Sequence, residues 1–452
     1  MDIRIMLSLL HRLEQMRQRD RWTRQQLEAY QAEALRRLRE YAYSHSPFYQ
    51  RFHKGVTHRP LSELPVLTKA MLMENFDEIV TDRCIRLKAV REFAAARSED
   101  RLFLDRYRLT ATSGSSGQPG FFLFDEPEWL TIMASFARGQ EWSGAQVSLL
   151  RRRKMATVAS ISPWHMSSQV AATAKTWWTP SIRLPASDPL ADSVRRLNAW
   201  QPDILIAYAS MARILAEEQL AGRLHIRPGK TFTSSEVLTD ETRRRVKLAW
   251  GDEPFNQYGA TETADIAAEY QACRHMHIFE DLLIIEVVDE AYRPVPPGAY
   301  GARLLVTTLF SRTQPLIRYE INDSVRLATE LCSSGLPFAM LESIQGRVED
   351  TLRLRAKSGG QVAIQPLVFN RVMDILPVSG WQIVQSAADS LTVLLSGAGE
   401  ELTDTALCES LGQALVTQGV RIPHIQVQRV STIPKTTSGK TPLIRAYHPA
   451  RS

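Results

Sequence analysis

The sequence predicts an α/β protein with a large N-terminal domain of mixed sheets and helices and a small α+β C-terminal domain. Short β-rich runs alternate with helical stretches between residues 155 and 250, which is typical of βαβ units around a mostly parallel sheet. Close-set β-rich runs follow from residue 282. The chain has 452 residues, whereas one hydrophobic core organises at most roughly 250–300. More than one domain is therefore expected.

The N-terminal region is expected to be helical. Apolar residues recur at the spacing of one helix face within residues 1–45, with arginines and glutamates between them. Ser46-Pro47 ends this pattern, because proline disfavours helical geometry in the residue before it. A further helical segment is expected from about Thr68, after the proline-containing stretch 59–65.

The middle of the chain is expected to alternate strands with helices. The segment 240–250 carries the clearest helix signals, because Thr239 and Asp240 can cap its N-terminus and Gly251 can end it. The other elements expected here are strands at 155–160, 203–207 and 230–233 and helices near 189–200 and 210–221.

The last third of the chain predicts a β-rich subdomain followed by a compact α+β module. The β-rich subdomain has expected strands at 282–288, 303–309, 317–321 and 324–327. After Gly346 the pattern predicts short strands, a helix near 402–416 and a final strand near 425–430. We therefore expect an N-terminal domain at 1–345, a domain boundary at 346–350 and a C-terminal domain at 351–452.

The bulk composition excludes several classes of protein. The four cysteines are few and widely spaced, which argues against a disulfide framework. No segment reaches the ~18 uninterrupted apolar residues of a membrane span, so a cytoplasmic protein without membrane contact is expected. The basic run 151–154 lacks the interleaved aromatic residues of a nucleic-acid platform. The net charge of +6 suits either solubility or anionic ligands.

One segment has the composition of a phosphate-binding loop. Residues 112–120 read Thr-Ser-Gly-Ser-Ser-Gly-Gln-Pro-Gly. Glycines let a loop fold tightly and expose backbone N–H groups, and hydroxyls add donors for phosphate oxygens. The spacing of a P-loop is absent. A flexible linker has a similar composition, but this segment lies between two apolar stretches.

Four further motifs follow in order. Residues 257–262 read Gln-Tyr-Gly-Ala-Thr-Glu, which could frame a base and hold magnesium. Residues 318–323 end in Asp323, which can accept hydrogen bonds from ribose hydroxyls. Residues 346–350 read Gly-Arg-Val-Glu-Asp, and residues 434–440 read Pro-Lys-Thr-Thr-Ser-Gly-Lys. The last motif presents Lys440 as a point charge suited to phosphate.

The order of these five motifs resembles that of the adenylate-forming superfamily, which contains acyl-CoA synthetases, adenylation domains and luciferases. Within it, the chain is similar to the phenylacetate-CoA ligase-like branch, which includes CapK-like proteins. Ser46-Pro-Phe-Tyr49 and Leu64-Pro-Val-Leu-Thr-Lys69 resemble the opening of that branch. The resemblance covers nearly the whole chain.

The resemblance implies that ATP activates a carboxylic acid as an acyl-adenylate. Lys440 would bridge the substrate carboxylate and the α-phosphate, Thr261 would contact the α-phosphate, and Glu262 would ligate Mg²⁺. Tyr258 would lie near the base, and Asp323 would hold the ribose hydroxyls. The residues implied for nucleotide binding are Thr112, Ser113, Gly114, Ser115, Ser116, Gly117, Ser235, Glu236, Gln257, Tyr258, Gly259, Ala260, Asp323 and Arg347.

The resemblance also implies a C-terminal domain that rotates between two half-reactions, with Glu349 or Asp350 as the hinge acid. Two departures from the family pattern stand out. The phosphate loop ends in Gly120, where many relatives carry lysine or threonine. Some relatives also hold a zinc ion in a Cys/His cluster, whereas Cys273, His277 and Cys332 leave such a site one ligand short unless His275 serves, so a lost or degraded zinc site is expected here. Free buried cysteines are the alternative.

The acid pocket is expected near Trp164, His165, Tyr208, Ser210 and Ser234. The flat faces of Trp164 and Tyr208 favour an aromatic or heteroaromatic acid, although core packing would equally explain Trp164. The acyl acceptor is expected to be coenzyme A, with a carrier-protein phosphopantetheine or an amine as the alternative. A homodimer is suggested by the family alone. The intact Glu262, Asp323 and Lys440 argue against a catalytically inactive relative.

Overall fold

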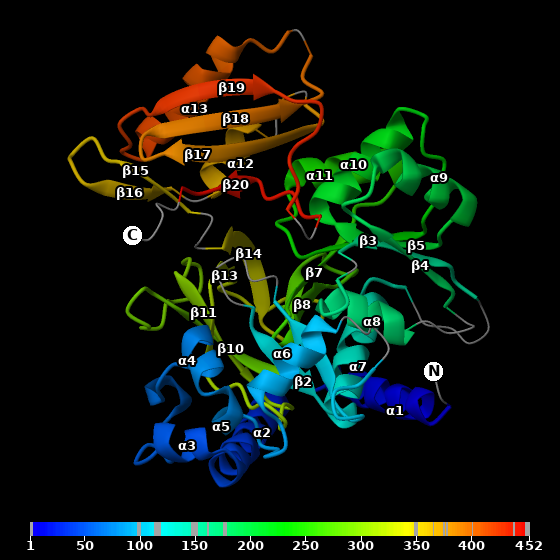
Figure 1. Cartoon of the computed structure of the whole chain (residues 1–452), viewed down its shortest axis with the longest axis vertical. Coiled ribbons are helices and arrows are strands. Elements are labelled where there is room, and N and C mark those ends of the chain that lie inside the picture. Colours follow the sequence, from blue (N-terminus) through cyan, green and yellow to red (C-terminus); the bar gives the residue numbers. More distant parts are fainter. Residues whose placement is uncertain are drawn as a thin grey trace.

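A nine-stranded mixed sheet forms the centre of the N-terminal part, within the residues that the structure describes (Figure 1). The computed structural model describes residues 3–96, 101–112, 119–145, 152–160, 162–174, 179–347, 351–364, 366–373, 376, 378–399, 401–436 and 439–447. The strand order is β13-β14-β9-β8-β7-β6-β5-β3-β4. The sheet is parallel from β4 to β7 and antiparallel from β7 to β13. Its strands are β3 (Met155–Ala159), β4 (Ser181–Pro185), β5 (Ile204–Tyr208), β6 (Lys230–Ser234), β7 (Phe255–Ala260), β8 (Ala264–Glu269), β9 (Met276–Ile278), β13 (Asp323–Leu327) and β14 (Met340–Arg347).

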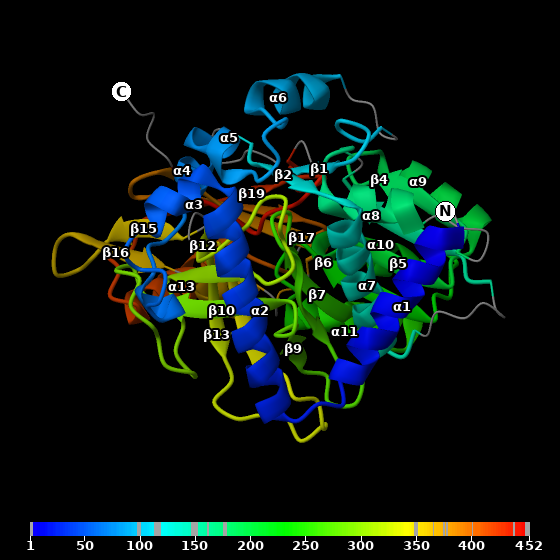
Figure 2. The ribbon, with the colours of Figure 1, turned by 90° about the horizontal axis from the view of Figure 1, so that it is seen from below.

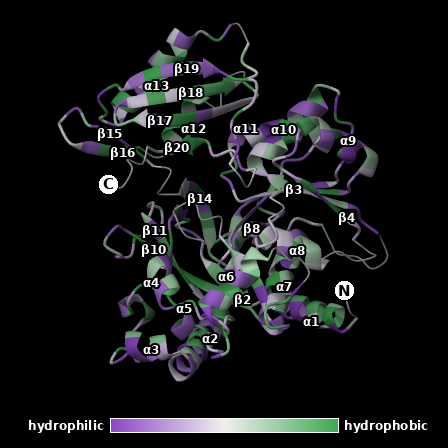
Figure 3. Cartoon of the chain, in the orientation of Figure 1, coloured by the Kyte–Doolittle hydropathy of each residue, from purple (hydrophilic) through white to green (hydrophobic). Residues whose placement is uncertain are grey.

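Helices connect the parallel strands, as the alternating pattern predicts. They are α9 (Leu190–Trp200), α10 (Ala209–Leu220) and α11 (Asp240–Trp250). The predicted caps of α11 are confirmed. The Thr239 side chain accepts a hydrogen bond from the Thr242 amide, and Gly251 ends the helix with a φ of 89°. Figure 3 shows hydrophilic colour on the outer turns of α9, which faces solvent.

A second sheet and a layer of N-terminal helices complete this part (Figure 2). The sheet is antiparallel, in the order β10-β11-β12. The first 45 residues form two helices, because Thr23 starts the second one with a capping box. The remaining elements are α1 (Ile3–Arg19), α2 (Arg24–His45), α3 (Pro47–Phe52), η1 (Leu61–Glu63), α4 (Lys69–Glu74), α5 (Phe76–Ile79), α6 (Leu87–Ala95), β1 (Arg108–Ala111), β2 (Phe121–Phe124), α7 (Glu126–Trp142), α8 (Met166–Ala174), β10 (Leu283–Val288), β11 (Arg303–Thr308) and β12 (Tyr319–Ile321).

The C-terminal part has its own hydrophobic core, and this confirms the predicted α+β module. The buried cluster runs from Leu352 to Ile444 and contains no residue from the N-terminal part. Its main sheet has the order β19-β18-β17-β20. The boundary at 346–350 stays a prediction, because residues 348–350 lie outside the described ranges. The elements are β15 (Leu352–Arg355), β16 (Gln361–Ile364), α12 (Pro366–Met373), β17 (Gly380–Ala387), β18 (Ser390–Ser396), α13 (Asp404–Thr417), β19 (His424–Arg429) and β20 (Ile444–Arg445).

None of the helices described here combines the length and the apolar composition that a membrane crossing requires.

Candidate active site

Two of the predicted motifs meet in a short hydrogen bond. Tyr258 on β7 donates its hydroxyl hydrogen to Oδ2 of Asp323, the first residue of β13, over 2.6 Å. A hydrogen bond to a carboxylate is among the stronger ones in proteins. The sequence predicts that these residues contact the base and the ribose of one nucleotide, and the fold brings them side by side.

The turn between β7 and β8 carries Thr261 and Glu262. Gly259 permits this tight hairpin, since a Cβ there would lie 2.6 Å from the carbonyl oxygen of Ala264. Burial, together with the neighbouring Glu262 carboxylate, raises the pKa of Tyr319 well above its usual value. Thr110 on β1 donates a hydrogen bond of 3.3 Å to the carbonyl of Thr261. The turn therefore lies beside the strand that leads into loop 112–120.

The two ends of loop 112–120 are joined at its base. The Thr112 amide donates to the Gly120 carbonyl over 3.0 Å, and the Gly120 amide donates to Oγ1 of Thr112 over 2.8 Å. Residues 113–118, which include the predicted phosphate ligands Ser113, Gly114, Ser115, Ser116 and Gly117, lie outside the described ranges.

Lys69, to which the sequence motifs assign no site role, lies at the base of this loop. Its Nζ donates to Oγ1 of Thr112 over 3.2 Å, and its Cε would lie 3.2 Å from a Cβ on Gly120. A short β-bridge places it: the Leu67 amide donates to the Arg318 carbonyl over 3.1 Å, and Leu67 accepts from the Glu320 amide over 3.0 Å. A lysine from a distant segment thus lies at the base of a loop whose own residue 120 is glycine.

Lys440 lies beside two residues of the predicted acid pocket. Its Nζ is 5.5 Å from the centroid of the Tyr208 ring. Burial and the positive charge of Lys440 lower the pKa of His165 to about 4, so this imidazole is neutral near pH 7. Burial also raises the pKa of Tyr208 to about 12. Its hydroxyl accepts a hydrogen bond from the Ser160 amide over 2.9 Å. These neighbours suit an anionic group held next to a lysine.

Glu236 connects this region to the C-terminal part. Its Oε2 accepts from the Ser210 amide over 2.8 Å, and its Oε1 accepts from the Thr441 amide over 2.9 Å. Burial raises the pKa of the carboxyl group, while these hydrogen bonds and Lys440 oppose the rise. The carboxylate is therefore directed at the interface between the N-terminal and C-terminal parts.

No family model matches the chain, but relatives in other organisms are similar to it over most of its length. Phenylacetate-coenzyme A ligase of Thermus thermophilus is 25% identical over 381 residues, which cover 80% of this chain and 78% of that protein. Protein CapK of Staphylococcus aureus is 24% identical over 404 residues, which cover 86% of this chain and 80% of CapK. Among solved structures, 2-hydroxyisobutyryl-CoA ligase with 2-HIB-AMP in the postadenylation state has a TM-score of 0.72 at 21% identity, covering 94% of this chain and 89% of that one. The chain has the adenylate-forming fold.

The structural likeness depends on the state of that ligase. Its thioesterification state, with 2-HIB-AMP and CoA, gives a TM-score of only 0.58, although 95% of this chain and 92% of the other are covered. An open conformation of it gives 0.60. Because sequence and coverage hardly differ, the lower scores reflect how the parts are arranged. The present arrangement of the adenylate-forming fold is more similar to the postadenylation state.

Some predicted site residues lie elsewhere or are only partly described. The Gln257 side chain points to α7, where a Cβ on Gly139 would lie 2.6 Å from its Nε2, so it is not brought to the face that carries Tyr258. Trp164 donates to the carbonyl of Ala94 over 2.9 Å and packs in the core against α6, which favours the core-packing alternative. The backbone of Arg347 pairs with Asp323. The hinge candidates Glu349 and Asp350 lie outside the described residues.

Three further predicted residues, Ser234, Ser235 and Ala260, lie at or directly after the ends of strands β6 and β7. Ser234 ends β6, and Ala260 ends β7. Ser235 follows Ser234 with a φ of 68°, in the left-handed region, which turns the chain so that Glu236 reaches the Ser210 amide.

A Cys/His cluster lies beside β9 of the nine-stranded sheet. The ligand atoms of Cys273, His275 and Cys332 lie within 4.8 Å of one another, and Nε2 of His277 is 3.3 Å from Sγ of Cys273. Burial raises the pKa of Cys332, but hydrogen bonds from Ser334 and His275 outweigh it and lower that pKa to about 7. The three residues whose ligand atoms lie together are therefore Cys273, His275 and Cys332, and His277 lies beside Cys273.

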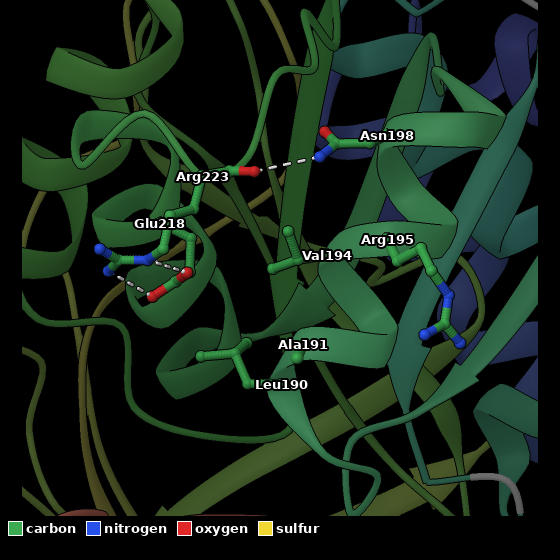
Figure 4. A pocket seen from close by; sticks show the side chains of 7 residues that line it. All are labelled: Leu190, Ala191, Val194, Arg195, Asn198, Glu218 and Arg223. Carbon is green, nitrogen blue, oxygen red and sulfur yellow. Dashed lines mark hydrogen bonds and ion pairs between the residues drawn. The ribbon is translucent and has the colours of Figure 1, made fainter.

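A separate surface pocket of about 600 Å³ lies between α9 and the end of α10 (Figure 4). The Glu218 carboxylate accepts two hydrogen bonds from Arg223, of 2.7 and 2.8 Å. The Asn198 amide donates to the carbonyl of Arg223. Glu218 and Arg223 are paired with each other, Arg195 forms an ion pair of 2.8 Å with Asp192, and none of the predicted site residues lines the pocket.

Proposed function

We propose that this protein uses ATP to activate a carboxylic acid as an acyl-adenylate and then transfers the acyl group to the thiol of coenzyme A. The observation that carries the proposal is the position of Lys440, which reaches Tyr208 and His165 from the C-terminal part. The phenylacetate-coenzyme A ligase and 2-hydroxyisobutyryl-CoA ligase relatives support the same activity.

In the first half-reaction, a carboxylate oxygen of the acid attacks the α-phosphorus of ATP. The bond from this phosphorus to the oxygen that bridges to the β-phosphate breaks, and pyrophosphate leaves with that electron pair. Negative charge crowds around the α-phosphate as the bond forms, and a fixed cation lowers the barrier electrostatically. Lys440 supplies this cation, and Thr261 contacts the same phosphate. Glu262 would hold Mg²⁺, which neutralises charge on the phosphates.

The nucleotide would be bound across the same region. Asp323 holds the ribose hydroxyls, and Tyr258 lies near the base while its hydrogen bond orients the Asp323 carboxylate. Arg347 assists from the strand that pairs with Asp323. Loop 112–120 wraps the β- and γ-phosphates through its backbone amides, and Lys69 adds the positive charge at its base.

In the second half-reaction, the thiol sulfur attacks the acyl carbon, and AMP leaves with the electrons of the anhydride bond. Lys440 must then withdraw to open a path to the acyl group. We propose that the C-terminal domain 351–452 rotates against the N-terminal domain 1–345 about residues 346–350, with Glu349 or Asp350 as the pivot. The difference between the TM-scores, 0.72 and 0.58, supports an arrangement on the adenylation side.

The acid is proposed to be aromatic or heteroaromatic, because the Tyr208 ring lies at the pocket beside Lys440. Ser210, Ser234 and the neutral His165 would complete its polar surroundings. A carrier-protein phosphopantetheine or an amine is the alternative acceptor, and a homodimer is the proposed assembly.

We further propose that Cys273, His275 and Cys332 bind a structural zinc ion, with His277, which lies beside Cys273, as the candidate fourth ligand, because thiols and imidazoles are the ligand types that zinc prefers. The ion would fix the loop before β9 and would take no part in the reaction.

Pyrophosphate release with a panel of carboxylic acids, with and without coenzyme A, tests the proposal. We expect release with at least one aromatic acid and the matching thioester when coenzyme A is present. Release without any thioester would refute the coenzyme A acceptor and favour the carrier or amine. No release with any acid, under conditions where ATP binds, would refute the activity itself.

A further inference from the structure

Among the described residues, three charged side chains form hydrogen bonds between the N-terminal and C-terminal parts, each with a backbone group of the other part. Glu236 accepts from the Thr441 amide over 2.9 Å. Lys435 donates to the carbonyl of Ala186 over 2.6 Å, and Arg213 donates to the carbonyl of Val378 over 2.6 Å. Hydrogen bonds to ionised groups are stronger than neutral ones. These contacts fix the main chain of one part against the other.

Two of these contacts flank Lys440 on the same loop. Thr441 follows it directly, and Lys435 precedes it by five residues. The Lys435 Nζ also lies 3.6 Å from Sδ of Met211 on α10, so this lysine enters the N-terminal part. In Figure 1 the red segment before β20 reaches toward the helices of the N-terminal part, where Lys435 contacts α10. The loop is thus held on both sides of its catalytic lysine.

A hydrogen bond within the N-terminal part holds the Glu236 side chain in the orientation that contacts Thr441. One carboxylate oxygen accepts from the Ser210 amide in the first turn of α10, where the helix dipole favours a negative charge. The other oxygen is then aimed at Thr441. A carboxylate has acceptors at both oxygens, whereas an amide of the same shape has one acceptor and one donor. Glutamine therefore cannot make both hydrogen bonds.

The loop that carries Lys440 also packs tightly against the N-terminal part, at Ala186 and Ser187. A Cβ on Gly439 would lie 2.8 Å from Cβ of Ala186 and 2.9 Å from the Ser187 amide nitrogen. Because Ala186 also accepts the hydrogen bond from Lys435, one turn of the N-terminal part contacts the loop twice. The position of Lys440 follows from these backbone contacts.

We propose that Glu236 and Lys435 are positioning residues that latch the loop of Lys440 against the acid pocket for adenylation and release it for thioester formation. This inference rests on the proposed function. It separates the two lysines of the loop: Lys440 acts on the reacting groups, and Lys435 anchors the loop that carries it.

Hydrogen exchange of the full-length protein tests the latch without any substrate. In Glu236→Gln, we expect the peptide that contains the Thr441 amide to exchange at least about ten-fold faster, because a hydrogen bond to a charged acceptor is lost. Lys435→Met should accelerate exchange in the same peptide by removing the second anchor. Glu330→Gln, an exposed carboxylate in a loop of the N-terminal part, is the matched control and should not change it.

The two half-reactions provide the functional test. Glu236→Gln and Lys435→Met should slow pyrophosphate release about ten-fold or more, while thioester formation from supplied acyl-adenylate and coenzyme A should stay within about two-fold of the wild type. Equal losses in both half-reactions would show a general structural role and overturn the proposal.

Unchanged exchange at Thr441 in both variants would also overturn it. A failure of the proposed function would be distinct, because the wild type itself would then release no pyrophosphate with any acid. The exchange measurement would still decide whether the two side chains hold the loop.

Discussion

Replacing Lys69 with methionine removes the positive charge at the base of the phosphate loop and keeps most of the side-chain volume. Lys69 reaches Oγ1 of Thr112 over 3.2 Å and is only partly buried. A lysine about 4 Å from a phosphate oxygen gains about 4 kcal/mol at an effective dielectric constant of about 20. The lysine loses hydration on binding, so a net loss of about 2–3 kcal/mol in transition-state stabilisation is expected.

This loss corresponds to a decrease of about 30- to 150-fold in kcat/KM for ATP. The assay is pyrophosphate release at saturating acid with varied ATP, and thermal unfolding shows whether the variant is folded. Lys88→Met, at an exposed position on α6, is the matched control. Lys69→Arg should restore part of the rate, since it keeps the charge. A decrease of less than about three-fold in Lys69→Met would refute the assignment of a phosphate-binding role.

The other residues give three further predictions. Lys440→Ala should lower pyrophosphate release at least about 100-fold and leave ATP affinity within a few-fold, as measured by calorimetry; normal release would contradict its role. Burial lowers the pKa of His53 and of His165 to about 4, so each imidazole is protonated in the unfolded chain below pH ~6.5 but stays neutral in the folded chain, and its contribution to the free energy of unfolding should fall as the pH decreases from about 6.5 to about 4. NMR titration of the two imidazoles in the folded protein checks this, and ordinary histidine pKa values near ~6.5 would contradict it. Cys332→Ser should reduce bound zinc, measured by elemental analysis, from about one ion per chain to well below one; a wild-type protein purified without zinc would contradict the site.

The parts of the fold that depend on local chemistry could be predicted from the sequence. The helix α11 is an example, because Thr239 and Gly251 act on their own neighbours. The alternation of strands and helices likewise predicts the parallel half of the main sheet, since every βαβ unit is formed by adjacent segments. The motifs at 257–262 and 318–323 identified Tyr258 and Asp323, and the fold brings them into contact.

The positions of side chains that the sequence could not predict depend on contacts between distant segments. Lys69 is the last residue of the segment 64–69, which the sequence singles out only as a resemblance, and its place beside Thr112 requires the bridge between Leu67 and Tyr319. The direction of the Glu236 side chain likewise requires the C-terminal part, because Thr441 provides one of its two donors. Gln257 is predicted to bind the nucleotide together with Tyr258, but successive residues of a strand point to opposite faces, so its side chain lies on the face opposite to that of Tyr258.

The bridge between Leu67 and Tyr319 also determines when the protein can become active during its synthesis. A ribosome releases the chain from the N-terminus, so the Lys69 segment emerges long before its partner strand β12. Pairing of segments so distant in sequence is slow, because a long loop must close before the contact is gained. A nascent chain that ends before Tyr319 has no means to hold Lys69 at the loop. Lys69 is therefore expected to reach loop 112–120 only after β12 has been synthesised, when most of the chain has been made.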